Sequence, residues 1–239
     1  MPDQERKPSI PVKAETFAHA LPHFAKQIAG HGRVKIVAIG SSSTAGEGGI
    51  VPYPTRLQSA LQAHYRERVF VLNRGIGGQE APEELDRFQA DVIDEKPALV
   101  IWQVGTNAVW QPGRNFEKVA KAIKDGLEQL ASEAADVVLM DLQYVPALLT
   151  DDKIAATRRM LSLIGEIAAA TPYVNVFHRF TMMRKWHEIE KRSFDTMVDP
   201  VDDDRLHQSD YSTQRIVYEL REQIVKGVER AGAPQAKAC

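Results

Sequence analysis

Short apolar runs alternate with longer amphipathic stretches along most of this chain. Runs rich in β-branched and apolar residues predict buried strands over residues 34–39, 69–72, 98–104, 136–140 and 174–177. Apolar residues at helical spacing predict helices over residues 17–28, 53–65, 115–130, 153–169 and 209–228. Strands and helices that alternate in this order predict a five-stranded parallel sheet, with helices covering both of its faces.

Length and composition fit one globular domain with a sizeable core. The chain has 239 residues, of which 44% are hydrophobic and 26% are charged. We expect a single domain over residues 16–232, with polar tails at 1–15 and 233–239. The formal net charge is -2 and the basic residues are scattered, which argues against a nucleic-acid partner. The one cysteine, Cys239, cannot form an intrachain disulfide.

Two features of the chain bear on its localisation. No run of about 18 apolar residues occurs, so the sequence predicts no membrane span. Residues 1–13 are polar, contain prolines and lack the apolar stretch of a signal peptide. We therefore expect a cytoplasmic protein, with the periplasm as the alternative if a processed segment precedes this sequence.

Two segments carry residue types suited to nucleophilic catalysis. Ser42 lies in a cluster of small polar residues directly after the first predicted strand, where a turn would lift it to the edge of the sheet. Asp204 and His207 stand just before the last predicted helix. A histidine there can act as a base toward the serine, and an aspartate can hold its other nitrogen. Taken singly, the serine cluster is also typical of a helix cap. The acidic run 202–204, taken singly, is typical of a solvated loop.

Two further segments follow the second and third predicted strands. Residues 75–78 are rich in glycine, which lets a backbone N–H approach a ligand closely but is also common in plain turns. Asn107 follows the third strand, where its side-chain amide would either cap a turn or point at a developing oxyanion. The carboxyl ends of parallel strands share one edge of a sheet, which is where ligands bind in such folds. All four segments are therefore expected at the same edge.

Taken together, the four segments resemble the motif blocks of the SGNH (GDSL) hydrolases. The resemblance rests on residues 40–44, 73–78, 105–107 and 204–207, and it extends from about residue 34 to residue 220. It implies a flavodoxin-like three-layer α/β/α sandwich and the activity of a carboxylic ester hydrolase. It implies no cofactor, and no histidine or cysteine cluster with metal-ligand spacing occurs, so we predict no metal.

The resemblance also assigns roles to individual residues. It implies Ser42 as the nucleophile, His207 as the base and Asp204 as the carboxylate that orients the base. It further implies that the Ser42 N–H, the Gly78 N–H and the Asn107 amide form an oxyanion hole. Water would then hydrolyse the acyl-enzyme formed on Ser42.

The chain departs from the family pattern at three positions. Ser41 stands where the family usually has an aspartate before the nucleophile, so a hydroxyl must support this turn. Ala108 stands where an aspartate usually follows the asparagine, and Gln208 stands where a proline often follows the histidine. None of these changes removes a primary catalytic group. Ser41 is the main competitor of Ser42 for the role of nucleophile.

The residues after the strand ends predict the acyl group. Tyr53, Trp110, Gln143 and Tyr144 combine aromatic and polar surface, which suits an acetyl ester carried on a carbohydrate. The counter-evidence is an apolar wall formed by residues 145–149 together with Met182, Met183 and Trp186, which would suit a longer acyl chain. The sequence alone leaves the oligomeric state and the physiological substrate open.

Two alternative functions follow from the same architecture. The serine-rich turn after the first strand would cradle a phosphate in a flavodoxin-like protein that binds FMN, although the Asp204–His207 pair then has no role and the lysine of a P-loop is absent. A catalytically silent carbohydrate-binding relative of the hydrolases is the other alternative. The intact set of serine, asparagine, aspartate and histidine argues against silence.

Overall fold

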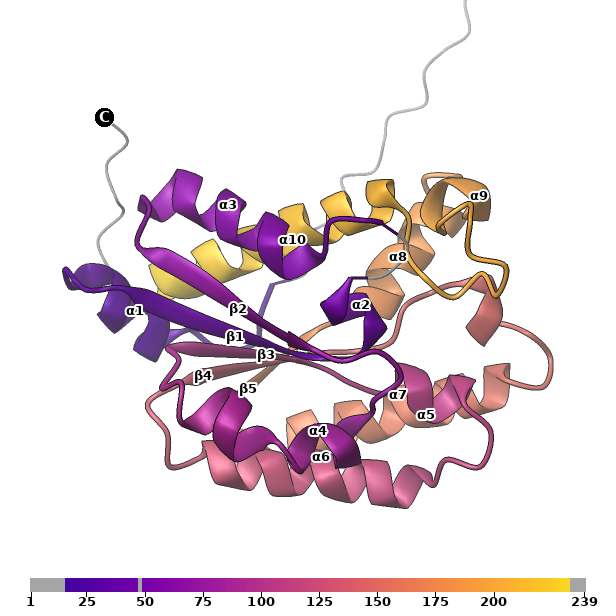
Figure 1. Cartoon of the computed structure of the whole chain (residues 1–239), viewed down its shortest axis with the longest axis horizontal. Helices are drawn as coiled ribbons and strands as arrows, with labels where there is room; N and C mark the ends of the chain where they lie inside the picture. Colours follow the sequence, from indigo (N-terminus) through magenta and orange to yellow (C-terminus); the bar gives the residue numbers. More distant parts are fainter. Residues whose placement is uncertain (1–15, 47–48, 233–239) are drawn as a thin grey trace, which may run out of the picture.

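The computed structural model describes residues 16–46 and 49–232 of the chain. The two expected tails, at 1–15 and 233–239, lie outside these residues, so the predicted domain boundaries stay predictions. Figure 1 shows a central sheet with helices above and below it.

The sheet has five parallel strands in the order β2-β1-β3-β4-β5. The strands are β1 (Val34–Gly40), β2 (Val69–Gly75), β3 (Leu99–Gln103), β4 (Asp136–Met140) and β5 (Val174–Phe177). This order is that of flavodoxin-like folds, with the chain reversing its direction of travel across the sheet between β1 and β3. The predicted three-layer fold with five parallel strands is therefore confirmed. Every residue of β3 and β4 is buried, as expected of parallel strands covered on both faces.

Helices cover the two faces of the sheet. One face carries α1 (Pro22–Ala29), α3 (Tyr53–Tyr65) and α10 (Asp210–Arg230), and the other carries α4 (Ala81–Leu85), α6 (Phe116–Leu130) and α7 (Ile154–Ala169). The remaining elements are α2 (Ser42–Ala45), the π-helical η1 (Gln89–Ile93), α5 (Thr106–Trp110), the 3-10 turn η2 (Pro146–Leu148), α8 (Arg179–Glu188) and α9 (Phe194–Met197). Most of the short helices follow the carboxyl ends of strands.

The first helix differs from the sequence prediction. We expected a helix over residues 17–28 that Pro22 interrupts, whereas α1 begins at Pro22. Proline suits the first turn of a helix because it lacks only an N–H that would have no intrahelical partner. The carboxylate of Asp136, at the start of β4, accepts the N–H groups of His23 and Phe24 in that first turn. Residues before Pro22 instead bond to β5 and α10, through His19 N to Asn175 Oδ1 and Leu21 N to Gly227 O, and Phe17 and Leu21 are buried.

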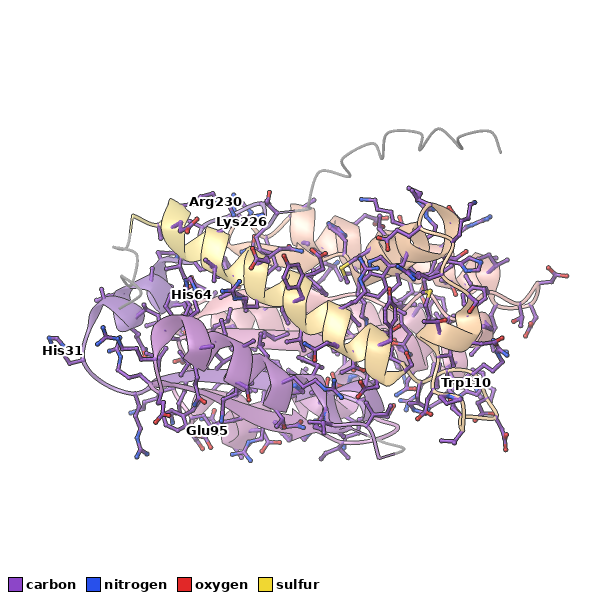
Figure 2. The ribbon with its side chains drawn as sticks, turned by 90° about the horizontal axis from the view of Figure 1, so that it is seen from above. His31, His64, Glu95, Trp110, Lys226 and Arg230 are labelled. Atoms are coloured by element: carbon purple, nitrogen blue, oxygen red, sulfur yellow. The ribbon has the colours of Figure 1, made fainter. Side chains whose placement is uncertain are left out.

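The two ends of the sheet are distinct surfaces. His31 precedes β1 at the amino end, and Trp110 ends α5 at the carboxyl end, and the two lie at opposite ends of the molecule (Figure 2). Ser42, Gly78 and Asn107 follow strand ends on the Trp110 side, and the loop before α10 brings His207 to Ser42 at the same edge. The fold therefore gathers them at one edge.

Candidate active site

Ser42 begins a short helix directly after β1. The turn is fixed from below by Gln103 of β3, whose Oε1 accepts hydrogen bonds from Ser41 N (3.1 Å), Ser41 Oγ (3.0 Å) and Thr44 Oγ1 (3.3 Å). Gly40 is required here, since a Cβ at that position would lie 2.4 Å from Thr44 Oγ1. Ser41 is thus turned inward and buried, and its hydroxyl supports the turn as expected from the sequence.

Ser42 and His207 lie together at the carboxyl edge of the sheet. His207 Nε2 is 3.1 Å from Ser42 Oγ, although 165 positions separate the two residues in sequence. His207 Nδ1 is 3.0 Å from Asp202 Oδ2. When Nδ1 carries the proton it donates to Asp202, and Nε2 then accepts from the Ser42 hydroxyl. This is the geometry of a serine, a base and a carboxylate that orients the base.

The carboxylate beside the histidine is Asp202, which corrects our expectation for Asp204. The chain reverses between residues 199 and 206, so that Asp202 Oδ2 also accepts the N–H groups of Leu206 (2.8 Å) and His207 (2.5 Å). Asp204 is exposed in the middle of this reversal, and no hydrogen bond or ion pair joins it to His207 within the described part of the chain. The acidic run was visible in the sequence, but which of its members turns back on His207 depends on the loop.

The environment of Asp202 favours its charged form. Partial burial works to raise the pKa of its carboxyl, but the two backbone N–H donors and the nearby His207 hold that pKa below its usual range. A carboxylate that stays ionised can hold the imidazole in one orientation and stabilise the imidazolium.

The oxyanion candidates come from three turns at the same edge. Ser42 N belongs to the first turn of α2, where an N–H has no intrahelical partner. Gly78 lies in the turn after β2 with φ of 77°, a backbone conformation that favours glycine. No described residue accepts a hydrogen bond from either N–H. Asn107 Nδ2 donates to Gln79 O at 2.7 Å, which ties the asparagine to the Gly78 turn and leaves the second amide hydrogen for another acceptor.

A further residue, Gln143, joins three parts of the site. Its Nε2 donates to Leu206 O (3.0 Å), and its Oε1 accepts from Thr106 Oγ1 (3.3 Å) and more weakly from Ser43 Oγ (3.5 Å). The sequence led us to expect Gln143 on the substrate side, but it is fully buried. In the sequence, the signal for Gln143 as a site residue is that it is a polar residue shortly after a strand. Only the fold shows that its side chain points inward.

A small cavity adjoins Ser42 among the described residues. A cavity of about 20 Å³ is lined by Ser42, Ser43, Gly46, Ile50, Pro52, Tyr53, His207, Gln208 and Thr213. That volume holds about one water-sized group. Larger grooves of about 400–430 Å³ lie between α6 and α7, between α7 and α8, and beside α1. None of them is lined by Ser42, Asn107 or His207, but Tyr144 and Leu149 line the groove between α7 and α8.

The apolar wall expected from the sequence is mostly core. Met183 and Trp186 of α8 are buried, as are Val145 and Leu148 after β4. Tyr53 is buried as well, and burial raises the pKa of its hydroxyl. Tyr144 remains half-exposed and packs edge-on against Phe180 and stacked against Phe194. The aromatic surface available to a substrate is therefore smaller than the sequence suggested.

The described part of the chain offers neither a cluster of metal-ligating side chains nor a membrane-spanning helix. Among residues 16–46 and 49–232, no group of three or more histidine, cysteine, aspartate or glutamate side chains could hold a metal ion. Over the same residues, no helix has both the length and the apolar character needed to cross a membrane.

Comparison with known proteins shows the family of this chain. The model of the Non-GDSL lipase-like family matches residues 8–230, and the chain belongs to that family. The match differs from the GDSL name to which the sequence motifs pointed. A curated relative, an uncharacterized lipoprotein of Bacillus subtilis, is 38% identical over 81 residues, which is 33% of either chain. The match thus spans about a third of that relative's length.

Several solved structures share the fold. An acetylxylan esterase from Geobacillus stearothermophilus matches with a TM-score of 0.68 and 19% identity, over 81% of this chain and 95% of that one. An alpha/beta hydrolase from the metagenome of Lake Arreo matches with a TM-score of 0.68 and 17% identity, over 82% and 99%. Another acetyl xylan esterase matches with a TM-score of 0.68 and 18% identity, over 80% and 100%.

Three of the Geobacillus structures are described as catalytic mutants, in which alanine replaces a histidine, a serine or an aspartate.

Proposed function

We propose that this chain is a serine esterase of the SGNH type, which hydrolyses carboxylic esters through an acyl-enzyme on Ser42. The observation that carries the proposal is the chain of contacts from Ser42 Oγ to His207 Nε2 and from His207 Nδ1 to Asp202, at 3.1 and 3.0 Å. These distances suit proton transfer from the serine to the histidine. The esterase neighbours with the same fold agree with the proposal.

The proposed reaction has two steps. His207 Nε2 takes the Ser42 proton as Ser42 Oγ attacks the ester carbonyl, and the protonated His207 then gives that proton to the leaving alcohol. In the second step His207 takes a proton from water as the water attacks the acyl carbonyl, and it then gives that proton to Ser42 Oγ as the acid is released. Asp202 stabilises the imidazolium in both steps. The N–H groups of Ser42 and Gly78 and the amide of Asn107 stabilise the oxyanion.

The proposed substrate is an ester of a short acyl group, most simply acetyl. The cavity beside Ser42, at about 20 Å³, has room for a methyl group, which is similar in size to a water molecule. A longer chain would need an apolar trough, but the side chains expected to form one, such as Met183 and Trp186, are buried in the core. Trp110 and Tyr144 keep partly exposed rings that suit a carbohydrate carrier.

The contacts of the serine turn disfavour the FMN alternative. A phosphate cradle needs free donors, but the hydroxyls of Ser41 and Thr44 are bonded to Gln103 and that of Ser42 to His207. The same Ser42–His207 contact also disfavours the second alternative, a catalytically silent relative that binds carbohydrate, because carbohydrate binding does not require that contact. A colourless purified protein would count further against FMN.

The experiment that tests the proposal compares acetyl and octanoyl p-nitrophenyl esters by kcat/KM. We expect the acetyl ester to be preferred by at least about tenfold, since each misplaced methylene costs on that order. The Ser42→Ala variant serves as the control for background hydrolysis. A wild type no faster than this variant would refute the esterase. A tenfold preference for octanoyl would refute the short-acyl assignment alone.

A further inference from the structure

The carboxylate of Glu80 is buried beneath the oxyanion candidates. Glu80 is 2% exposed, and its Oε1 accepts the N–H groups of Gly105 (2.8 Å) and Ala81 (3.0 Å). Its Oε2 accepts the N–H of Ala108 at 2.9 Å. One carboxylate thus holds amides on both sides of Asn107, which lies between Gly105 and Ala108.

The short helix α5 depends on this contact because it lacks a cap of its own. Gly105 precedes the helix in a left-handed conformation, and it provides no side chain to accept a hydrogen bond from the first turn. Ala108 carries no polar group either. Within the described residues, Glu80 is the one carboxylate bonded to the backbone of this turn.

Resting on the proposed function, we infer that Glu80 is a positioning residue for the oxyanion hole. Its carboxylate fixes the start of α5, and through α5 it fixes the Asn107 amide against the Gly78 turn. Glu80 itself touches neither substrate nor Ser42. It acts through the asparagine.

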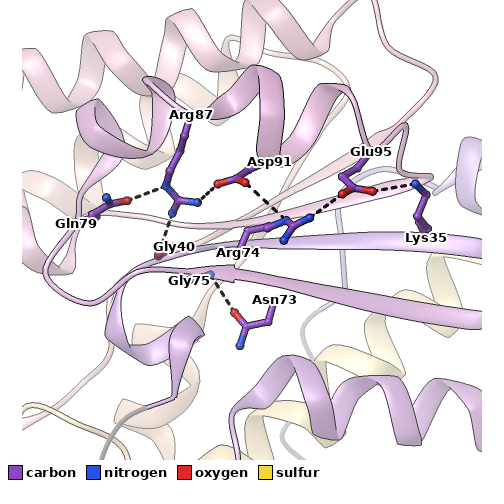
Figure 3. A network of polar contacts seen from close by, with 9 residues as sticks. All are labelled: Lys35, Gly40, Asn73, Arg74, Gly75, Gln79, Arg87, Asp91 and Glu95. Carbon is purple, nitrogen blue, oxygen red and sulfur yellow. Dashed lines mark hydrogen bonds and ion pairs between the residues drawn. The ribbon is translucent and has the colours of Figure 1, made fainter.

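The turn that carries Glu80 is itself held by ion pairs. Glu83 Oε2 accepts from Glu80 N (3.1 Å), and Arg114 pairs with Glu83 at 2.5 Å. On the preceding residue, Gln79, the backbone oxygen accepts from Asn107 and the side chain accepts from Arg87 at 2.7 Å. Figure 3 shows Arg87 continuing this network through Asp91 and Arg74 to Glu95 and Lys35. These contacts fix the turn that carries Glu80, and Glu80 in turn fixes the start of α5.

A second buried glutamate provides a matched control. Glu84 is one helical turn away and fully buried, and it accepts from Trp102 Nε1 at 2.6 Å. Within the described residues, no hydrogen bond joins Glu84 to α5. Burial, and the neighbouring Glu80, raise the pKa of Glu84 well above its usual range. Burial raises the pKa of Glu80 as well, but the N–H groups of Gly105, Ala81 and Ala108 work to lower that pKa. We therefore assign the negative charge of the pair to Glu80, which accepts three N–H groups, and the proton to Glu84.

Charge and positioning predict opposite effects of neutralising Glu80. A negative charge beneath the oxyanion hole disfavours a second negative charge developing above it, so by charge alone Glu80→Gln should raise kcat. By positioning, Glu80→Gln should lower kcat, because an amide nitrogen cannot accept the N–H that Oε2 now accepts. The sign of the change separates the two.

The experiment measures kcat and KM on p-nitrophenyl acetate, and amide hydrogen exchange by NMR, for the full-length wild type, Glu80→Gln and Glu84→Gln. We expect Glu80→Gln to lower kcat by about tenfold to a hundredfold, less than the loss of a donor outright, with KM nearly unchanged. Glu84→Gln should stay within about twofold in kcat. The Gly105 and Ala108 amides should exchange faster in Glu80→Gln only. Added to Asn107→Ala, Glu80→Gln should lower kcat no further, since both changes act through one group.

Three outcomes would overturn the inference: a raised kcat in Glu80→Gln, equal losses in the two glutamine variants, or additive losses with Asn107→Ala. Unchanged exchange of both amides would overturn the contact itself. An inactive wild type, in contrast, would refute the proposed esterase. Faster exchange in Glu80→Gln would then still show that the carboxylate anchors α5.

Discussion

The turn that carries the candidate nucleophile and the turn that carries the oxyanion candidates are anchored by different chemistry. Ser41 and Thr44 beside the nucleophile are held by the neutral amide of Gln103. Asn107 lies on a helix that is held by the buried carboxylate of Glu80, within a network of ion pairs. Both anchors are buried, and both lie under the same edge of the sheet.

The difference follows from what each turn must hold. The serine turn continues directly from β1 and packs against its neighbour β3, so a neutral acceptor on β3 is enough to fix it. Because Gln103 is neutral, Asp202 is the carboxylate that faces His207 on this side of the site. The oxyanion turns follow β2 and β3, which are not neighbours in the sheet. Charged groups, which form stronger hydrogen bonds than neutral ones, bridge that gap.

The largest effect is expected on the nucleophile side. Ser42→Ala and His207→Ala should each lower kcat by about 10⁴- to 10⁶-fold, and the double variant should be no worse, because the two residues act as one unit. Steady-state hydrolysis of p-nitrophenyl acetate measures this. Labelling by a fluorophosphonate should disappear in Ser42→Ala. Labelling that persists at Ser41 or Ser43 would show that another serine is the nucleophile.

The carboxylate beside His207 gives the next effect. Asp202→Ala should lower kcat by about 10²- to 10⁴-fold, because the imidazole loses the group that orients it and stabilises its charge. Asp204→Ala, a change in the same loop at an exposed position, should stay within about twofold and serves as the control. A larger loss in Asp204→Ala than in Asp202→Ala would contradict the geometry described above.

On the oxyanion side, Asn107→Ala should lower kcat by about 10²- to 10³-fold, the usual cost of one oxyanion donor. KM should change little, since the amide binds the transition state better than the substrate. Rates measured across a range of p-nitrophenyl acetate concentrations separate the two constants. An effect on KM alone would assign Asn107 to substrate binding instead.

The neutral anchor can be broken without adding charge. Gln103→Leu leaves three donors of the serine turn, on Ser41 and Thr44, without an acceptor, which should cost about 1–3 kcal/mol of unfolding free energy for each buried donor left unpaired. Urea unfolding measures this loss, and kcat should fall by about tenfold as the turn loosens. Equal stability of variant and wild type would show that Gln103 is not the anchor.

The smallest effect concerns Glu84, whose pKa burial raises well above its usual range. Because the folded state then binds a proton more tightly than the unfolded state, the stability that this proton gives is complete below pH 4.5 and is lost as pH rises through the folded pKa. Glu84→Gln cannot titrate, so the variant should gain stability over the wild type between pH 5 and pH 8. Thermal unfolding at the two values tests this. A gain that does not change with pH would contradict a raised pKa.

Local periodicity was enough to predict most elements of the fold. Apolar runs and helical stripes located the five strands and the long helices, and β4 and β5 have the predicted bounds. Element ends were less predictable. Pro22 was expected to interrupt a helix and instead begins α1, because its missing N–H is harmless there and Asp136 caps the same turn from another element.

The sequence by itself determined which candidate residues follow strand ends, and parallel pairing then brings Ser42 and Asn107 to one edge, whereas His207 reaches that edge on the loop before α10. It did not determine which aspartate faces His207, because three consecutive aspartates are equivalent until a loop turns one of them back onto the ring. The sequence also did not predict that Gln143 points inward or that Glu80 contacts α5. Strand and helix patterns are local, whereas loop reversals and buried polar contacts depend on segments far apart in the chain, so only the tertiary structure decides them.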